Sequence, residues 1–187
     1  MLRLRFLLLT LLLIGSHAYS QVSEPDWAAV EEETLRHFRA LLRFDTSDPP
    51  GRELPAAEYL RDVLEAEGIA VEMLSVDPER PNVVARLKGD GSQEPLLIMA
   101  HTDVVNVDPE KWTFPPFSAT VDGGYVYGRG AVDDKDNLAA GLMVMLELKR
   151  QNVPLSRDVI FLAESGEEGA TEYGIEFMVN EHFEKID

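Results

Sequence analysis

Residues 96–103 read Leu-Leu-Ile-Met-Ala-His-Thr-Asp, and residues 158–163 read Asp-Val-Ile-Phe-Leu-Ala. Continuous apolar runs of this length are typical of strands that are buried on both faces of a parallel sheet. Residues 137–150, between the two runs, are rich in Ala, Leu, Met and Glu, which favours a helix. A strand, a helix and a second strand in this order predict an α/β fold in which helices flank a mixed, mostly parallel sheet.

Apolar residues at helical or strand spacing, bounded by turn-forming residues, extend this unit on both sides. The further expected elements are helices over 25–44, 55–67 and 171–185, strands over 71–76 and 82–87, and a hairpin over 117–127. The 187 residues contain no internal repeat and no low-complexity linker, so we expect one domain.

The net charge of −17 excludes two classes of partner. Nucleic-acid binding needs a basic footprint, and docking on anionic lipid needs clustered Lys and Arg. The chain has no cysteine, which rules out disulfides and a thiol nucleophile. Any zinc site must therefore be built from His and carboxylate side chains.

The first 20 residues have the features of a secretory signal peptide. Arg3 and Arg5 precede an apolar run over 6–14, and small or polar residues lead to Gln21. The run is shorter than the roughly 20 apolar residues that cross a bilayer. We expect cleavage before Gln21, a secreted or periplasmic protein, and no membrane attachment after cleavage.

Three short groups of side chains could carry chemistry: His-Thr-Asp at 101–103, Asp-Asp-Lys-Asp at 133–136 and Glu-Ser-Gly-Glu-Glu at 164–168. Each has an ordinary explanation. A loop His can lie beside a turn-forming Asp, acids are favourable at a helix N-terminus, and adjacent Glu residues are common on solvated loops. Taken singly, none of the three groups predicts a site.

Their order along the chain makes the combination informative. The first and third groups follow the two expected buried strands, and the second opens the helix between them. Ligands of open α/β sheets bind beyond the carboxyl ends of the strands, so the three groups could meet at one edge. There, His101 could direct one ring nitrogen at a metal while Asp103 holds the other. A carboxylate at 133 could bridge two cations.

Two other histidines, His37 and His182, are predicted to be surface residues because their neighbours are polar or terminal. No Gly-x-Ser-x-Gly motif is present, so a serine hydrolase has no support.

Four motifs in this order and spacing resemble the zinc-dependent exopeptidase family of aminoacylase-1, glutamate carboxypeptidase and succinyl-diaminopimelate desuccinylase. They are LLIMAHTDVV from 96, WTFPPF from 112, GRGAVDDKDN from 128 and FLAESGEEG from 161. The resemblance covers roughly residues 27–187. It implies a zinc-peptidase catalytic domain of the phosphorylase/hydrolase-like type, whose N-terminal part would be residues 21–187.

The resemblance also implies a role for each residue. His101, Asp133 and Glu168 would be ligands of two zinc ions, with cobalt or manganese as alternatives, and Asp133 would bridge the pair through a site whose Asp133–Asp134 peptide is cis. Asp103 would orient His101. Glu167 would be the general base. The implied reaction is hydrolysis of an amide bond next to a free carboxylate, in a peptide or an N-acyl amino acid.

The sequence departs from the family pattern in two respects. Asp136 stands where relatives usually have Gly. The family's remaining zinc ligands and its lid and dimerisation domain come after the position of Asp187, so a homodimer is expected only of a full-length protein. We therefore expect weak metal binding and little turnover from this chain alone.

Two alternatives remain open from the sequence. One is a non-catalytic, secreted acidic protein that binds a ligand or cation at the same edge. The other is an aminopeptidase of the same fold, which would recognise a free amino group instead of a free carboxylate.

Overall fold

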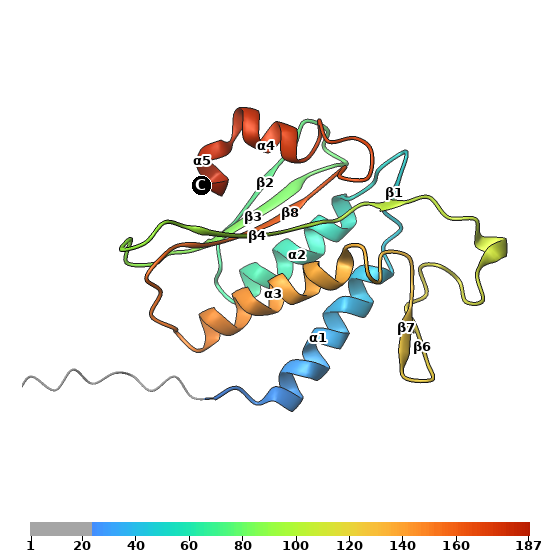
Figure 1. Ribbon diagram of the computed structural model, residues 1–187, viewed down its shortest axis with the longest axis horizontal. Helices are drawn as coiled ribbons and strands as arrows, with labels where there is room; N and C mark the ends of the chain where they lie inside the picture. Colours follow the sequence, from blue (N-terminus) through green and yellow to red (C-terminus); the bar gives the residue numbers. More distant parts are fainter. Residues whose placement is uncertain (1–23) are drawn as a thin grey trace, which may run out of the picture.

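The computed structural model describes residues 24–187 (Figure 1). The predicted signal peptide lies outside these residues. The helices are α1 (Trp27–Leu42), α2 (Leu54–Ala66), α3 (Lys135–Arg150), α4 (Ile175–Glu181), α5 (Phe183–Ile186) and the 3₁₀ turn η1 (Pro109–Lys111). The strands are β1 (Ser47–Asp48), β2 (Val71–Leu74), β3 (Asn82–Leu87), β4 (Leu96–His101), β5 (Val104–Val105), β6 (Thr120–Asp122), β7 (Tyr125–Tyr127) and β8 (Val159–Glu164).

The main sheet has the strand order β2-β3-β8-β4. The predicted β4-α3-β8 unit is confirmed, with β4 and β8 parallel and His101 opposite Glu164 in the register. The pairs β2–β3 and β3–β8 are antiparallel. The sheet is mixed, as expected, but it is less parallel than expected, because β4–β8 is its one parallel pair among the described residues.

The expectation that β4 is buried on both faces is wrong, whereas the same expectation for β8 is confirmed. Every residue of β8 is buried. In β4, which is an edge strand of the described sheet, Leu96 is 47% exposed and Met99 is 42% exposed. An apolar run reports a preference for burial, and it does not reveal whether a neighbouring strand provides that burial.

Helices cover the two faces of the sheet unequally (Figure 1). On one face α1, α2 and α3 form the larger core, in which Leu41, Leu60 and Leu142 pack with Phe161. On the other face α4 and α5 form a smaller core around Met178. No helix among residues 24–187 is both long and apolar enough to cross a membrane.

The predicted helix over 171–185 is instead the two short helices α4 and α5. Residues 165–174 form a loop that returns on itself, so that a Cβ atom at Gly174 would lie 1.9 Å from the carbonyl oxygen of Ser165. This close approach fixes the start of α4 at Ile175. At the junction of the helices, His182 has φ −139°, which interrupts the helical path.

The prediction that His37 is a surface residue is wrong. Its side chain is buried between α1 and α2, and its Nδ1 lies 2.7 Å from the hydroxyl of Tyr59. Burial lowers the pKa of His37, and the positive charge of Arg36 adds to this effect, although Glu33 opposes it. His37 therefore serves the packing of α1 on α2. His182 is half-buried, edge-on to Phe177.

Candidate metal centre

The three sequence groups meet at one edge of the sheet, beyond the carboxyl ends of β4 and β8. Ligand atoms of His101, Asp133 and Glu168 all lie within 4.8 Å of one another. His101 Nε2 is 3.0 Å from Asp133 Oδ1 and 3.8 Å from Glu167 Oε2. The parallel register of β4 and β8 explains this convergence, because it brings the residues that follow both strands to the same place.

Local contacts fix the orientation of His101. Its ring is buried, and Nδ1 lies 2.9 Å from the backbone carbonyl oxygen of Asp103. A carbonyl oxygen only accepts hydrogen bonds, so Nδ1 carries the proton and Nε2 faces Asp133 and Glu167. Burial lowers the pKa of His101, but Asp103 and Asp133 outweigh it and raise the pKa to about 10. Electrostatically, the site stabilises a positive charge at Nε2.

Asp103 has a second partner that the sequence did not reveal. Its buried carboxylate accepts hydrogen bonds from the backbone N–H groups of Glu167, at 3.0 Å, and Glu168, at 2.9 Å. The distance from Asp103 Oδ1 to His101 Nδ1 is longer, at 3.4 Å. Burial raises the pKa of Asp103, while His101 and the two N–H groups lower it more. Asp103 thus aligns the turn that carries both Glu residues, in addition to contacting the imidazole.

The start of α3 presents Asp133 to this site. The Asp133–Asp134 peptide is cis, as the resemblance implied. Asp134 is the N-cap of α3, and its Oδ2 accepts the backbone N–H of His101 at 3.2 Å. A Cβ atom at Gly130 would lie 2.7 Å from Val104, so the loop before Asp133 packs directly on β5. The Asp133 side chain remains 76% exposed.

Lys135 is a buried cation behind the site. Its Nζ donates a hydrogen bond of 2.8 Å to the backbone carbonyl of Phe44. Burial lowers the pKa of Lys135 to about 8, against the influence of Asp45 and Asp103. The sequence contained a signal for this burial, because Lys135 stands three residues before Leu138 and seven before Leu142 on the buried face of α3.

Arg80 is a second buried cation that the sequence did not reveal. Its guanidinium donates to Asp48 at 2.8 Å and to Glu53 at 2.7 Å, and it lies 4.5 Å from the ring centroid of Tyr173. A Cβ atom at Gly166, the residue before Glu167, would lie 3.2 Å from Arg80 Nη2. Arg80 therefore packs against the turn that contains Glu167 and Glu168.

The donor set fits zinc. One imidazole nitrogen and carboxylate oxygens are ligands that zinc accepts in hydrolytic sites. The carboxylates of Asp133, Glu167 and Glu168 are close enough to repel one another, and the pKa of Glu168 is raised, first by burial and then by Asp133. A cation would relieve this repulsion. Because Asp133 is largely exposed, its carboxylate can rotate to meet one.

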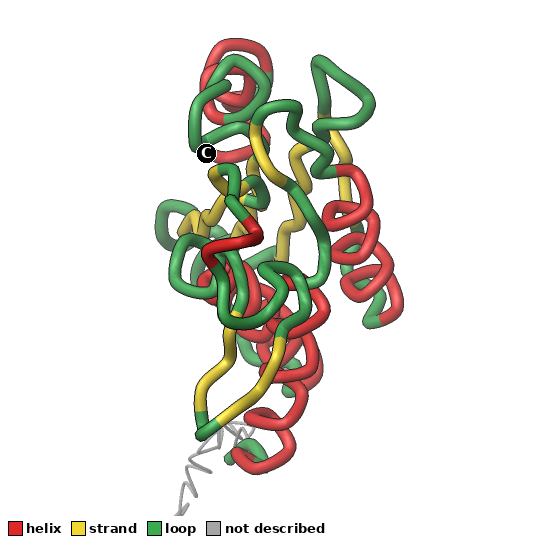
Figure 2. The backbone as a smooth tube through the Cα atoms, turned by 90° about the vertical axis from the view of Figure 1, so that its right-hand side faces the viewer, coloured by secondary structure: helices red, strands yellow, loops and turns green. Residues whose placement is uncertain are grey.

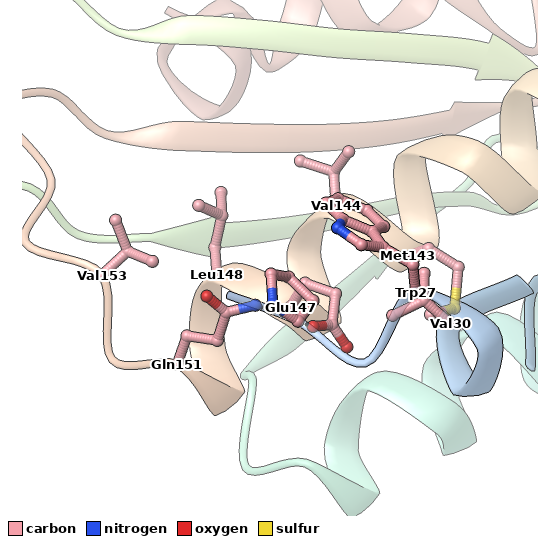
Figure 3. A pocket seen from close by; sticks show the side chains of 9 residues that line it. Trp27, Val30, Met143, Val144, Glu147, Leu148, Gln151 and Val153 are labelled. Atoms are coloured by element: carbon pink, nitrogen blue, oxygen red, sulfur yellow. Dashed lines mark hydrogen bonds between the residues drawn. The ribbon is translucent and has the colours of Figure 1, made fainter. Parts of the chain in front are cut away.

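A pronounced apolar pocket lies elsewhere on the molecule. It has a volume of about 290 Å³ and is formed by Trp27 and Val30 of α1 with Met143, Val144 and Leu148 of α3 (Figure 3). It shares no residue with the candidate metal centre. This apolar pocket is therefore not part of the candidate metal centre.

Comparisons with known proteins identify the family that this chain resembles. A sequence profile described as peptidase family M20/M25/M40 matches residues 97–187. The chain is 42% identical over 142 residues to N-formyl-4-amino-5-aminomethyl-2-methylpyrimidine deformylase from Halalkalibacterium halodurans, covering 74% of this chain and 33% of that protein. It is 34% identical over 155 residues to a "Probable succinyl-diaminopimelate desuccinylase" from Staphylococcus epidermidis, covering 82% of this chain and 37% of that protein.

Solved structures show the same fold. The M20 family metallo-carboxypeptidase from Sulfolobus solfataricus superimposes with a TM-score of 0.71 at 28% identity, over 83% of this chain and 35% of that one. Human carnosine dipeptidase 1 superimposes with a TM-score of 0.72 at 20% identity, over 86% of this chain and 39% of that one, which is a likeness of fold alone. The chain spans about a third of the length of the proteins it matches.

Proposed function

Because residues 97–187 belong to peptidase family M20/M25/M40, we propose that this chain carries the metal-binding edge of a di-zinc hydrolase that cleaves amide bonds next to a free carboxylate. The observation that supports this most directly is the meeting of His101, Asp133 and Glu168, which come from three different elements, within 4.8 Å. Peptides and N-acyl amino acids are the proposed substrates.

Each residue has a role in the proposal. His101, Asp133 and Glu168 would hold the metal, which supplies Lewis acidity when bound. Glu167, whose side chain is half exposed, would take a proton from the attacking water and return it to the leaving nitrogen. Asp103 would hold Glu167 and Glu168 in place through their N–H groups.

The exposed position of Glu167 suits this task. Its carboxylate is 51% exposed and lies 3.8 Å from Nε2 of His101, so it is open to solvent and close to a proposed metal ligand. A general base must be within hydrogen-bond reach of the proton that it removes, directly or through one water. Glu168, in contrast, is the Glu whose carboxylate belongs to the set of ligand atoms.

Metal analysis combined with a substrate panel, both carried out on the longest natural form of the protein, tests the proposal. Zinc should bind to the wild-type protein, and N-acyl amino acids or dipeptides with a free carboxylate should be hydrolysed faster than their C-terminal amides. Glu167→Gln should retain zinc and lose at least about 100-fold in kcat, the loss typical of a missing general base. Glu172→Gln, an exposed Glu on the same loop, is the matched control.

Three results would change the proposal. Undiminished turnover in Glu167→Gln would remove the assigned base. Preference for substrates with a free amino group over N-blocked ones would favour an aminopeptidase. Zinc binding without turnover, in the longest natural form of the protein, would favour the non-catalytic cation-binding alternative.

A further inference from the structure

A second groove is lined by residues of α1, the β6–β7 hairpin and the first turns of α3. Figures 1 and 2 show the backbone of these elements. Its volume is about 510 Å³. Most of its walls are apolar, formed by Leu35, Phe38, Val121, Val126 and Ala139. It shares no lining residue with the candidate metal centre or with the apolar pocket of Figure 3.

The groove contains a carboxylate without a partner. Asp136, in the first turn of α3, is half-buried, and its Oδ1 is shielded from solvent with no hydrogen-bond partner within residues 24–187. No Lys, Arg or His in this part of the chain lies within 4.0 Å of its oxygens. A second carboxylate, Glu31, also lines the groove, and the lining includes no cationic side chain.

This arrangement is unusual for a buried polar atom. A shielded carboxylate oxygen loses hydration, and a hydrogen-bond donor or a cation in the groove would compensate this loss. The terminal torsion of Asp is broad, so rotation lets either oxygen face the groove. A cation bound there would supply the missing donor and would complement the two negative charges.

We propose that this groove binds a protonated aliphatic amine. The ammonium group would donate to Asp136, and the alkyl part would contact Leu35, Phe38 and Val126. A primary ammonium has three donors and a compact charge, which suits a single carboxylate in an apolar wall better than a planar guanidinium does. The site uses none of the residues assigned to the metal, so it is independent of the proposed hydrolysis.

Titrations of the 187-residue chain with n-butylammonium, n-butanol and butyrate, at neutral pH with EDTA present, test this site. Butylammonium should bind at least about tenfold more tightly than butanol, which has the same alkyl chain without the charge. The methyl NMR signals of Leu35 and Val126 should shift during the titration. Asp136→Asn should weaken butylammonium binding by about tenfold, as expected for the loss of one charge-assisted hydrogen bond.

Two further variants locate the bound amine. Asp122→Asn removes an exposed acid of the hairpin that does not line the groove, and it should leave the affinity unchanged. Glu168→Gln removes a carboxylate of the candidate metal centre, and it should also leave the affinity unchanged.

The proposal is overturned if butanol binds as well as butylammonium, or if Glu168→Gln and not Asp136→Asn loses the binding. Failure of Asp136→Asn to fold would leave the methyl shifts in the wild-type chain as the deciding measurement. If those two methyl groups do not shift, the groove is not the site.

Discussion

Asp103 connects the two sides of the candidate metal centre at the scale of a single residue. Its carboxylate receives two backbone N–H groups from the turn at 167–168 and contacts the imidazole of His101. Asn at this position keeps one accepting oxygen and presents an NH₂ group to a backbone donor. One N–H group would then lose its acceptor.

We therefore expect Asp103→Asn to weaken zinc binding by roughly 10- to 100-fold, the range seen when groups that orient metal ligands are removed. It should also lower the free energy of unfolding by about 1–3 kcal/mol, because a buried donor is left unpaired. A competitive zinc titration and urea unfolding measure the two effects. Asp122→Asn is the control, and equal zinc affinity in wild type and Asp103→Asn would contradict the role given to the carboxylate.

Lys135 gives a prediction with a defined pH dependence. Its pKa is about 8 in the folded chain and 10.5 as the reference value. Between these pH values the unfolded chain binds the extra proton, so the contribution of Lys135 to the free energy of unfolding rises as the pH rises. The free energy of unfolding of the wild type minus that of Lys135→Met should increase by about 2–3 kcal/mol from pH 7 to pH 10.5. Urea unfolding of both proteins in EDTA tests this, and a difference that is flat with pH would show that the lysine is not buried.

The order of the three groups along the chain predicted that they could meet at one edge, and the family resemblance assigned His101, Asp133, Glu167 and Glu168 to a metal site there. It did not predict Arg80, whose partners Asp48 and Glu53 lie 32 and 27 residues away in the chain. Contacts over such separations leave no local pattern. They follow from the packing of the loops, which only the folded structure specifies.

At the scale of elements, Arg150 joins three helices at one end of the larger core. From the end of α3, it donates to Glu33 of α1 and to Glu67 after α2, each at 2.6 Å. The bond from Arg150 is the largest influence on Glu33 and lowers its pKa to about 2. A carboxylate with a lowered pKa stabilises the fold above its unfolded pKa, and this stabilisation is lost as the pH falls toward the folded pKa.

Arg150→Met should therefore lower the free energy of unfolding by about 1 kcal/mol at pH 7, a value discounted because the groups are partly exposed. The difference in free energy of unfolding between wild type and Arg150→Met should become smaller between pH 4.5 and pH 2, because Glu33 becomes protonated. Urea unfolding over this range measures it. Lys149→Met, on the adjacent exposed position, should behave like wild type, and an identical loss in both variants would assign the effect to the helix end rather than to the ion pairs.

The elements themselves were predicted well where periodicity was strong. The expected helices over 25–44, 55–67 and 137–150 correspond to α1, α2 and α3, with ends displaced by at most two residues. The pairing of the strands was harder to predict from the sequence. The antiparallel position of β3 against β8 depends on how residues 88–95 turn, and an apolar run is the same for either direction.

At the scale of the whole molecule, β4 is an edge strand of the main sheet within residues 24–187, and no described residue covers that edge. Leu96 and Met99 are exposed there, and an open apolar edge strand favours pairing with another chain. The 187-residue chain should therefore self-associate as its concentration rises, and Met99→Lys should reduce that association. Analytical ultracentrifugation measures it. Val179→Lys replaces an exposed valine of α4 and should have no effect; an equal effect of both variants would make the cause net charge rather than the edge.

The beginning of the chain gives a prediction for the protein in its cell. We propose that residues 1–20 direct export and are then removed. Mass spectrometry of the N-terminus should find Gln21 as the first residue of the exported protein. A mature protein that retains Met1 would contradict this proposal.

The register of β4 against β8 determines where residues can be inserted into this chain without moving the side chain of His101. His101 stands opposite Glu164, and side chains alternate between the faces of a strand. One residue inserted into β4 would turn the imidazole to the opposite side of the sheet, whereas the same insertion into the turn before Leu96 would leave it in place. Insertions and deletions among natural versions of this protein should therefore occur in residues 88–95 and be absent from the six residues of β4, which end at His101, even where the amino acids of β4 differ.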